Sequence, residues 1–218
     1  MNLRATVITA ASDFAERTVE GARAGIRAVA PALSGRDLPT LAFLAAGETA
    51  AWARLFGWKR INIAATAVPL WPAKASPVLR AGVLAGAAGQ VAKVLGGPTP
   101  LGVACVGAQH AAFAWELRHA CNDALGWGLR AAAWAAGIIA ARTPAERGAA
   151  AVAGAAVAAT SALAGDPQLR AEETMGASHG ANLLLFSEAL TVVARGGILE
   201  SLTHTAGTVL LVDALTRR

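Results

Sequence analysis

"GANLLLFSEALTVVARGG", residues 180–197, is an apolar run that is interrupted at its centre by Ser187 and Glu188. About 20 predominantly apolar residues are the length of a transmembrane helix. A carboxylate at the bilayer centre costs on the order of 3 kcal/mol on insertion scales, so such a group usually faces other helices. The run therefore predicts a membrane span whose Glu188 side chain points into the interior of a helical bundle.

The composition of the whole chain supports a membrane protein. Of its 218 residues, 55% are hydrophobic and only 15% are charged, and the mean hydropathy is +0.48. Soluble domains normally carry about a quarter of charged residues. We therefore expect an all-α, polytopic transmembrane helix bundle, and an alanine-rich soluble helical protein is the alternative.

The net charge of +5 does not indicate a nucleic-acid-binding protein. The basic residues lie mainly between the apolar runs and at the two ends of the chain, where anionic lipid head groups would meet them. We therefore expect membrane lipids as partners and no nucleic acid.

The sequence carries no signature of a metal or a cofactor. Cys105 and Cys121 have no CxxC or Cys/His spacing, which predicts two free thiols. Phosphate-loop, dinucleotide-binding, HExxH and nucleophile-elbow motifs are absent. We expect no metal site and no cofactor.

Four helix starts are marked by a capping residue followed by proline, which fixes φ at the first helical position. These pairs are Ser76-Pro77, Thr99-Pro100, Thr143-Pro144 and Asp166-Pro167. Together with the apolar runs they predict about eight spans, near residues 38–57, 60–74, 77–96, 99–117, 122–141, 147–164, 175–194 and 199–215. The second of these contains Pro69 and Pro72, so we expect it to be kinked or tilted.

The chain divides into an N-terminal extension, residues 1–36, and the bundle, residues 37–218. The extension mixes basic and acidic residues and is expected to be helical and cytoplasmic or interfacial. Eight spans place 11 Lys and Arg residues on the side that holds both termini and 7 on the other, with Arg130 inside a span. Under the positive-inside rule, both termini of this multi-pass protein are then cytoplasmic, in the plasma (inner) membrane of the cell.

Polar side chains inside the predicted spans indicate a polar interior cavity, because each needs a partner away from lipid. With the span at 122–141, we expect Arg130 to have a carboxylate partner, and a span boundary one turn away would make Arg130 superficial instead. Lys93 is expected to snorkel to the interface, and His110 and His179 have the alternative of packing as neutral histidines. The candidates are Glu48, Gln90, Lys93, His110, Arg130, His179, Glu188 and His204.

The closing stretch, residues 180–218, resembles the end of the YhhN family of lysoplasmalogenase-like integral membrane proteins. The matching positions are Ser187, Glu188 and Arg195, followed by the polar group Thr203, His204 and Thr205. Upstream, "AGVLAGAAGQVAKVL" carries Gln90 at the place of the family's Gly-Asp pair, and "GVACVGAQHAAFAWEL" carries His110. The resemblance covers roughly residues 38 to 216.

Eukaryotic members of this family hydrolyse the vinyl ether bond of lysoplasmalogens to an aldehyde and a glycerophospho-headgroup. That reaction needs an acid to protonate the vinyl carbon and a group that activates water. The resemblance implies that the family's two intramembrane aspartates correspond here to Gln90 and Glu188, and Gln90 cannot transfer a proton. One half of the catalytic pair is then missing, unless His110, His204 or Glu48 replaces it.

Three functions follow from these expectations. The first is a catalytically degenerate member that binds a lipid or serves as an accessory subunit of a larger membrane complex, for instance for lipid transport, with other membrane-protein subunits as partners. The second is an ether-lysolipid hydrolase with Glu188 as acid and His204 or His110 as base. The third is proton, ion or small-solute transport through the bundle. The residues expected at the lipid or polar cavity are Gln90, Ser187, Glu188, Glu48 and Arg195.

Overall fold

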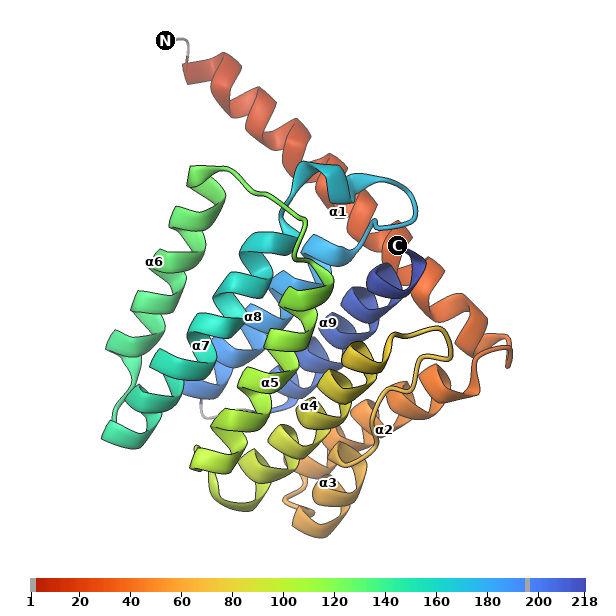
Figure 1. Cartoon of the computed structure of the whole chain (residues 1–218), viewed down its shortest axis with the longest axis vertical. Coiled ribbons are helices and arrows are strands. Elements are labelled where there is room, and N and C mark those ends of the chain that lie inside the picture. The colour runs from red at the N-terminus through yellow and green to blue at the C-terminus, as the bar shows by residue number, and fades with distance from the viewer. Residues whose placement is uncertain (1–2, 195–196) are drawn as a thin grey trace.

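The computed structural model describes residues 3–194 and 197–218, and within these ranges the protein is all-α (Figure 1). The described residues form nine α-helices and one short 3₁₀ helix. These are α1 (Leu3–Leu33), α2 (Leu38–Leu55), α3 (Lys59–Thr66), α4 (Pro77–Gly96), α5 (Pro100–Glu116), α6 (Ala124–Ala140), α7 (Pro144–Ala164), η1 (Pro167–Arg170), α8 (Ala177–Val193) and α9 (Ile198–Arg217).

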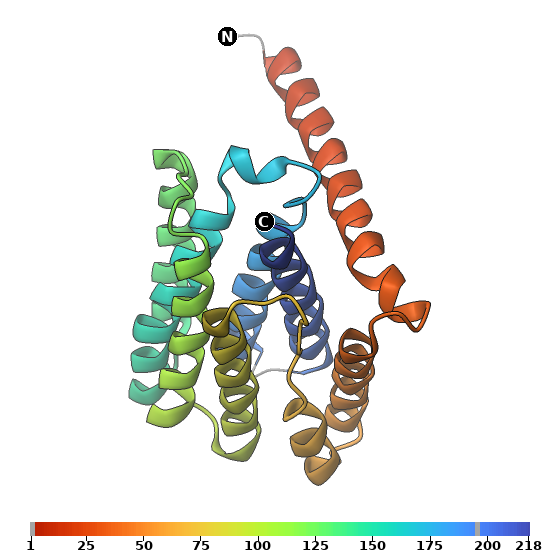
Figure 2. The same cartoon turned by 45° about the vertical axis from the view of Figure 1, so that its right-hand side comes forward.

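Seven helices of 17 to 21 residues, α2 and α4 to α9, form an up-and-down bundle (Figures 1 and 2). The helices α4 and α5, α6 and α7, and α8 and α9 pack as antiparallel pairs. We call the end of the bundle that holds the C-terminus and the starts of α4, α6 and α8 the terminal end. The opposite end, where α4, α6 and α8 finish, is the distal end.

The predicted helix over residues 60–74 is wrong. Helix α3 has eight residues, about 12 Å of length at 1.5 Å per residue, which is too short to cross a bilayer. The chain then returns from the distal end to the start of α4 as a non-helical segment, residues 67–76 (Figure 2). Pro69 and Pro72 lie in this segment, and each lacks the N–H that a continuing helix would need.

In the part of the chain that the structure describes, three helices, α4, α7 and α9, are long and apolar enough to cross a membrane by length and composition, and α6 is a shorter apolar helix. The structure thus confirms a helical bundle with apolar helices of membrane-spanning length.

The predicted helix starts are confirmed. The side-chain oxygens of Ser76, Thr99 and Thr143 accept hydrogen bonds from backbone N–H groups in the first turns of α4, α5 and α7. Thr143 and Glu146 form the reciprocal capping box, in which each side chain satisfies a backbone donor of the other residue. Asp166 caps the short 3₁₀ helix η1 in the same way.

The glycines of α4 allow close contact with α5. A Cβ atom on Gly82 would lie 2.5 Å from the Ala112 side chain, and one on Gly86 would lie 2.4 Å from the Gln109 side chain. Helices α8 and α9 approach even more closely, because a Cβ atom on Gly180 would lie 2.5 Å from the backbone nitrogen of Leu211. Such contacts between small residues are typical of helix packing in membranes.

The interior of the bundle is divided along its length. Large apolar side chains fill the half toward the terminal end: Leu79, Phe113, Leu117, Leu184 and Leu211, all at most 1% exposed. Both halves also hold buried polar side chains. Gln90, Glu200 and Ser201 lie toward the distal end, where α4 finishes and α9 begins, and Thr160, Ser161 and Asp166 lie toward the terminal end, where α7 finishes.

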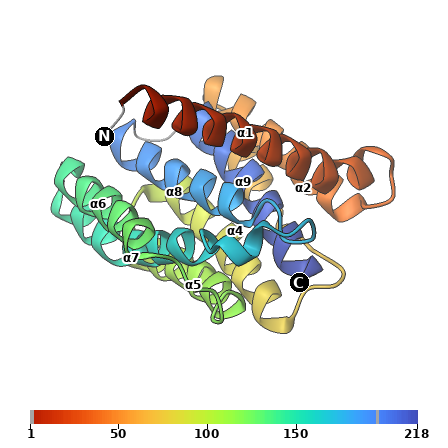
Figure 3. The same ribbon diagram turned by 90° about the horizontal axis from the view of Figure 1, so that it is seen from above.

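Helix α1 lies along one side of the bundle, beside α2 and α9, and its first half projects beyond the bundle (Figures 2 and 3). It packs through Ala24, Ala28 and Ala32, which are buried and one helical turn apart. The guanidinium of Arg27 donates to the carbonyl oxygen of Met175 and pairs with Asp213 at 3.5 Å. The extension is thus tied to the bundle near its terminal end.

Candidate functional site

A cleft with a volume of about 640 Å³ lies in the distal half of the bundle, with residues of α2 and of α4 to α9 in its walls. One part of its wall is apolar and includes Val103, Val106, Trp134, Leu185 and Val192. Another part is polar and charged and includes Arg54, Lys59, Lys93, Glu188 and Glu200. The cleft is therefore amphipathic.

An ion pair between α4 and α8 forms the first polar element of the cleft. The ammonium of Lys93 donates to the carboxylate of Glu188, and the two side chains are only 16% and 19% exposed. Lys93 thus points into the bundle, and the expectation that it snorkels to the interface is wrong. The pair gives the Glu188 carboxylate the partner that its place in an apolar run requires.

A second ion pair joins the last turn of α2 to the first turn of α9. The guanidinium of Arg54 pairs with the carboxylate of Glu200, which is almost fully buried. The hydroxyl of Ser187 donates to the backbone oxygen of Glu200 at 3.0 Å, so α8 is bonded to the same turn. The sequence-based reasoning missed Arg54 and Glu200 because both fall at span ends, where charged residues normally meet water.

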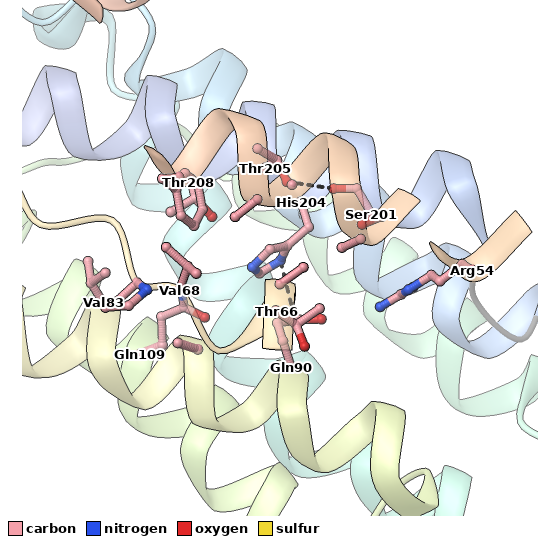
Figure 4. A pocket seen from close by; sticks show the side chains of 17 residues that line it. Arg54, Thr66, Val68, Val83, Gln90, Gln109, Ser201, His204, Thr205 and Thr208 are labelled. Carbon is pink, nitrogen blue, oxygen red and sulfur yellow. Dashed lines mark hydrogen bonds between the residues drawn. The ribbon is translucent and has the colours of Figure 1, made fainter. Parts of the chain in front are cut away.

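A smaller chamber of about 40 Å³ adjoins the cleft and shares Arg54 with it (Figure 4). The side-chain nitrogen of Gln90 donates to Nδ1 of His204 at 3.2 Å across this chamber. The hydroxyl of Thr208 is buried and has no hydrogen-bond partner among the described residues. The chamber is large enough for one or a few water molecules. Thr66, at the end of α3, and Val68, in the non-helical segment that follows, line one of its sides.

His110, on α5, is buried next to α7. Its ring meets Phe113 edge-on at 5.5 Å between centroids, and its backbone oxygen accepts a bond from the Thr160 hydroxyl. Its Nδ1 atom has no hydrogen-bond partner in the described part of the chain. His110 is not among the residues that line the two cavities.

The structure brings four expected polar residues together near the cleft: Gln90, Ser187, Glu188 and His204. It does not bring Glu48 there, which is a correction to the expected cavity. Glu48 is exposed on the outer face of α2, where its carboxylate accepts a bond from the Trp52 indole at 3.4 Å. Arg195 lies outside the described residues.

Two further polar residues stabilise contacts elsewhere. Arg130 donates to the side-chain oxygen of Asn182 at 3.2 Å and to the hydroxyl of Ser161 at 3.4 Å. The expectation of a carboxylate partner is therefore wrong, because neutral oxygens fill that role. His179 donates from Nε2 to the backbone oxygen of Arg17 at 2.8 Å and so connects α8 to α1.

The arrangement offers paired charges and hydrogen-bonding groups beside an apolar wall. Among the described residues, no group of three or more His, Cys, Asp and Glu side chains could hold a metal ion. The site is therefore suited to holding a ligand that has both polar and apolar parts. Comparison with protein-family models, with curated proteins and with solved structures gives no match for this chain.

Proposed function

We propose that the protein is a multi-pass membrane protein that binds a lipid in the cleft. Its eight crossings are the seven long helices and the composite crossing made of α3 and residues 67–76. Large apolar side chains on the outer surface would face lipid, among them Leu101, Leu125 and Ile139, which are 69% to 82% exposed. So much exposed apolar surface is otherwise a mark of interaction sites or aggregation in a soluble protein.

Aromatic residues near the two ends of the bundle support this orientation in a membrane. At the distal end, the rings of Trp52, Phe56 and Trp58 stack on one another in an exposed row. At the terminal end, the rings of Trp71 and Trp115 lie against Arg80 and Arg118 respectively. Tryptophan is enriched at both membrane–water interfaces, where its ring is in an apolar layer and its N–H meets water.

The amphipathic cleft is the observation that carries the lipid-binding function. Its volume of about 640 Å³ is within the range of pockets that bind small molecules, roughly 300 to 1,000 Å³. The ion pairs Lys93–Glu188 and Arg54–Glu200 would face the head group, and the wall that includes Val103, Trp134 and Leu185 would face one acyl or alkyl chain. A single-chain lysolipid fits these requirements, which agrees with the family resemblance of the sequence.

The same contacts support lipid binding better than they support lipid hydrolysis. The Glu188 carboxylate already has Lys93 as a partner, and the position of the second family carboxylate holds Gln90, which is bonded to His204. An acid and a water-activating base must both reach the reacting bond. We therefore propose that the lipid is bound and presented, and that hydrolysis is the alternative for the test below.

The first prediction concerns the size of the cleft. Replacing Ala133, which is exposed and lines the cleft, by Trp should fill part of it and weaken lysolipid binding roughly tenfold, since overpacking costs about 1–3 kcal/mol. Binding of palmitoyl lysophosphatidylcholine to the detergent-purified protein would be measured by native mass spectrometry. Ala132→Trp is the matched control, because Ala132 is also exposed on α6 but is not a lining residue.

Equal binding by the two tryptophan variants would contradict lipid binding in this cleft. The same preparations would be incubated with a lysoplasmalogen and assayed for released aldehyde. If the wild-type protein releases aldehyde and the Glu188→Gln variant does not, the result supports the hydrolase alternative over binding alone.

We also propose that the protein is an accessory subunit that contacts another membrane protein through α1. Opposite its packed alanine face, α1 carries Val19, Ile26 and Leu33, which are 48% to 73% exposed and seven residues apart. A repeat of seven places these side chains in one stripe along the helix. Such a stripe on an otherwise charged helix is suited to contact with an apolar helix of a partner.

The second prediction tests this contact. A photoreactive amino acid at Ile26 should form a cross-linked product of defined size with one protein in native membranes. The same group at Glu16, which is exposed on the same helix but outside the stripe, should not give this product. Cross-links to lipid alone at Ile26 would show that α1 lies on the membrane surface without a partner.

A further inference from the structure

We infer that the cleft takes its lipid from the leaflet that faces away from the cytoplasm. This inference rests on the proposed lipid-binding function and adds the source of the ligand. It depends on three features: where the charged groups lie along the helices, what closes the opposite half of the bundle, and how basic residues are distributed between the two ends.

The charged groups of the cleft all lie toward the distal end. Arg54 is in the last turn of α2, Lys93 is in the last turn of α4, and Glu200 is in the first turn of α9. Glu188 is in the second half of α8, which runs toward the same end (Figure 1). If these side chains bind the head group of a lipid, that head group lies near the distal end of the bundle.

The half of the bundle toward the terminal end is closed on one side by apolar side chains of α4, α5 and α9. On the other side, it is closed by hydrogen bonds that join Arg130, Ser161 and Asn182 across α6, α7 and α8. Between the chamber and the terminal end, buried apolar side chains of α4, α5 and α9 form one cluster. These side chains are Leu79, Phe113, Leu117, Leu211 and Leu215. Moving a polar head group through such a layer without hydrogen bonds costs several kcal/mol. The cleft is therefore supplied from the distal end, and the same closure disfavours the third expected function, transport through the bundle.

The basic residues orient the two ends in the membrane. Among the described residues, eleven Lys and Arg residues belong to α1 and the segments at the terminal end, and six belong to the distal end. Cytoplasmic segments carry the excess of Lys and Arg in membrane proteins. The terminal end is then cytoplasmic, and the distal cleft opens at the opposite face.

Labelling of single cysteines in oriented vesicles tests the inference. Ala189 lines the cleft and is exposed, so its cysteine variant, made with Cys105→Ala and Cys121→Ser, reports on the cleft. Cys121 is exposed between α5 and α6 at the terminal end, so the Cys105→Ala variant that retains it reports on the other face. Both full-length proteins would be treated with a membrane-impermeant maleimide in right-side-out and in inside-out vesicles.

We expect Ala189→Cys to be labelled in right-side-out vesicles and to lose labelling in inside-out vesicles, and Cys121 to show the reverse. Palmitoyl lysophosphatidylcholine added to right-side-out vesicles should reduce the labelling of Ala189→Cys. Labelling of Ala189→Cys only in inside-out vesicles, or in neither kind, overturns the inference. Labelling in right-side-out vesicles that the lysolipid does not reduce leaves the orientation intact and counts against the proposed lipid binding.

Discussion

Replacing Arg54 by methionine is expected to lower the free energy of unfolding by about 3–5 kcal/mol. The substitution leaves the carboxylate of Glu200 charged, only 2% exposed and without its partner. Both oxygens of that carboxylate lack any other hydrogen-bond partner among the described residues, so nothing else would offset the loss. Equilibrium unfolding of the purified protein in mixed detergent micelles, followed by tryptophan fluorescence, would give the free energy.

The double variant Arg54→Met/Glu200→Leu distinguishes loss of the ion pair from loss of packing. Buried ion pairs can often be replaced by apolar residues of similar volume with little change in stability. We therefore expect the double variant to recover most of the stability that Arg54→Met loses, which a double-mutant cycle would quantify. A double variant no more stable than the single variant would show that the pair does not control stability.

Gly180→Ala should be the second severe substitution. We expect it to lower the free energy of unfolding by about 3 kcal/mol, which is the upper end of the usual cost of overpacking. The new Cβ atom would lie 2.5 Å from the backbone nitrogen of Leu211 and 2.8 Å from the backbone oxygen of Gly207. Because both contacts are with backbone atoms, no change of rotamer relieves them, and α8 and α9 must move apart. The same unfolding measurement checks the result.

Gly107→Ala is the matched control for this prediction. Gly107 also lies within a helix, but a Cβ atom built there has no other atom within 4 Å beyond its own helix backbone. We expect this variant to be as stable as the wild type or up to about 1 kcal/mol more stable, because alanine favours helices over glycine. Similar losses in the two variants would mean that helix separation is not the cause.

Local features of the sequence predicted local structure well. The capping residues before Pro77, Pro100 and Pro144 mark helix starts that the structure confirms, because a cap and its helix are only a few residues apart. The structure of residues 60–74 was harder to predict. Their composition is apolar enough for a span, but Pro69 and Pro72 end the helix after α3, and only tertiary contacts decide the path that follows.

The polar site was predictable in part, for a physical reason. Gln90, Glu188 and His204 interrupt long apolar runs, so each had to find a polar neighbour in the interior. Glu48 also interrupts such a run, but α2 is apolar around most of its circumference, and its sequence does not show which face meets the bundle. The partners Arg54 and Glu200 come from opposite ends of the chain, and their pairing depends on how α2 and α9 are packed.

In the membrane arrangement that we propose, the composite second crossing has a consequence for how the protein is made. Its stretch at residues 67–76 lacks the backbone hydrogen bonds of a continuous helix, and hydrocarbon provides no water to replace them. This part of the chain therefore cannot partition into the bilayer by itself during synthesis. It would insert only after α4 and α9, which flank it in the folded protein, have been synthesised. Membrane insertion of the N-terminal half would then depend on translation of the last helix.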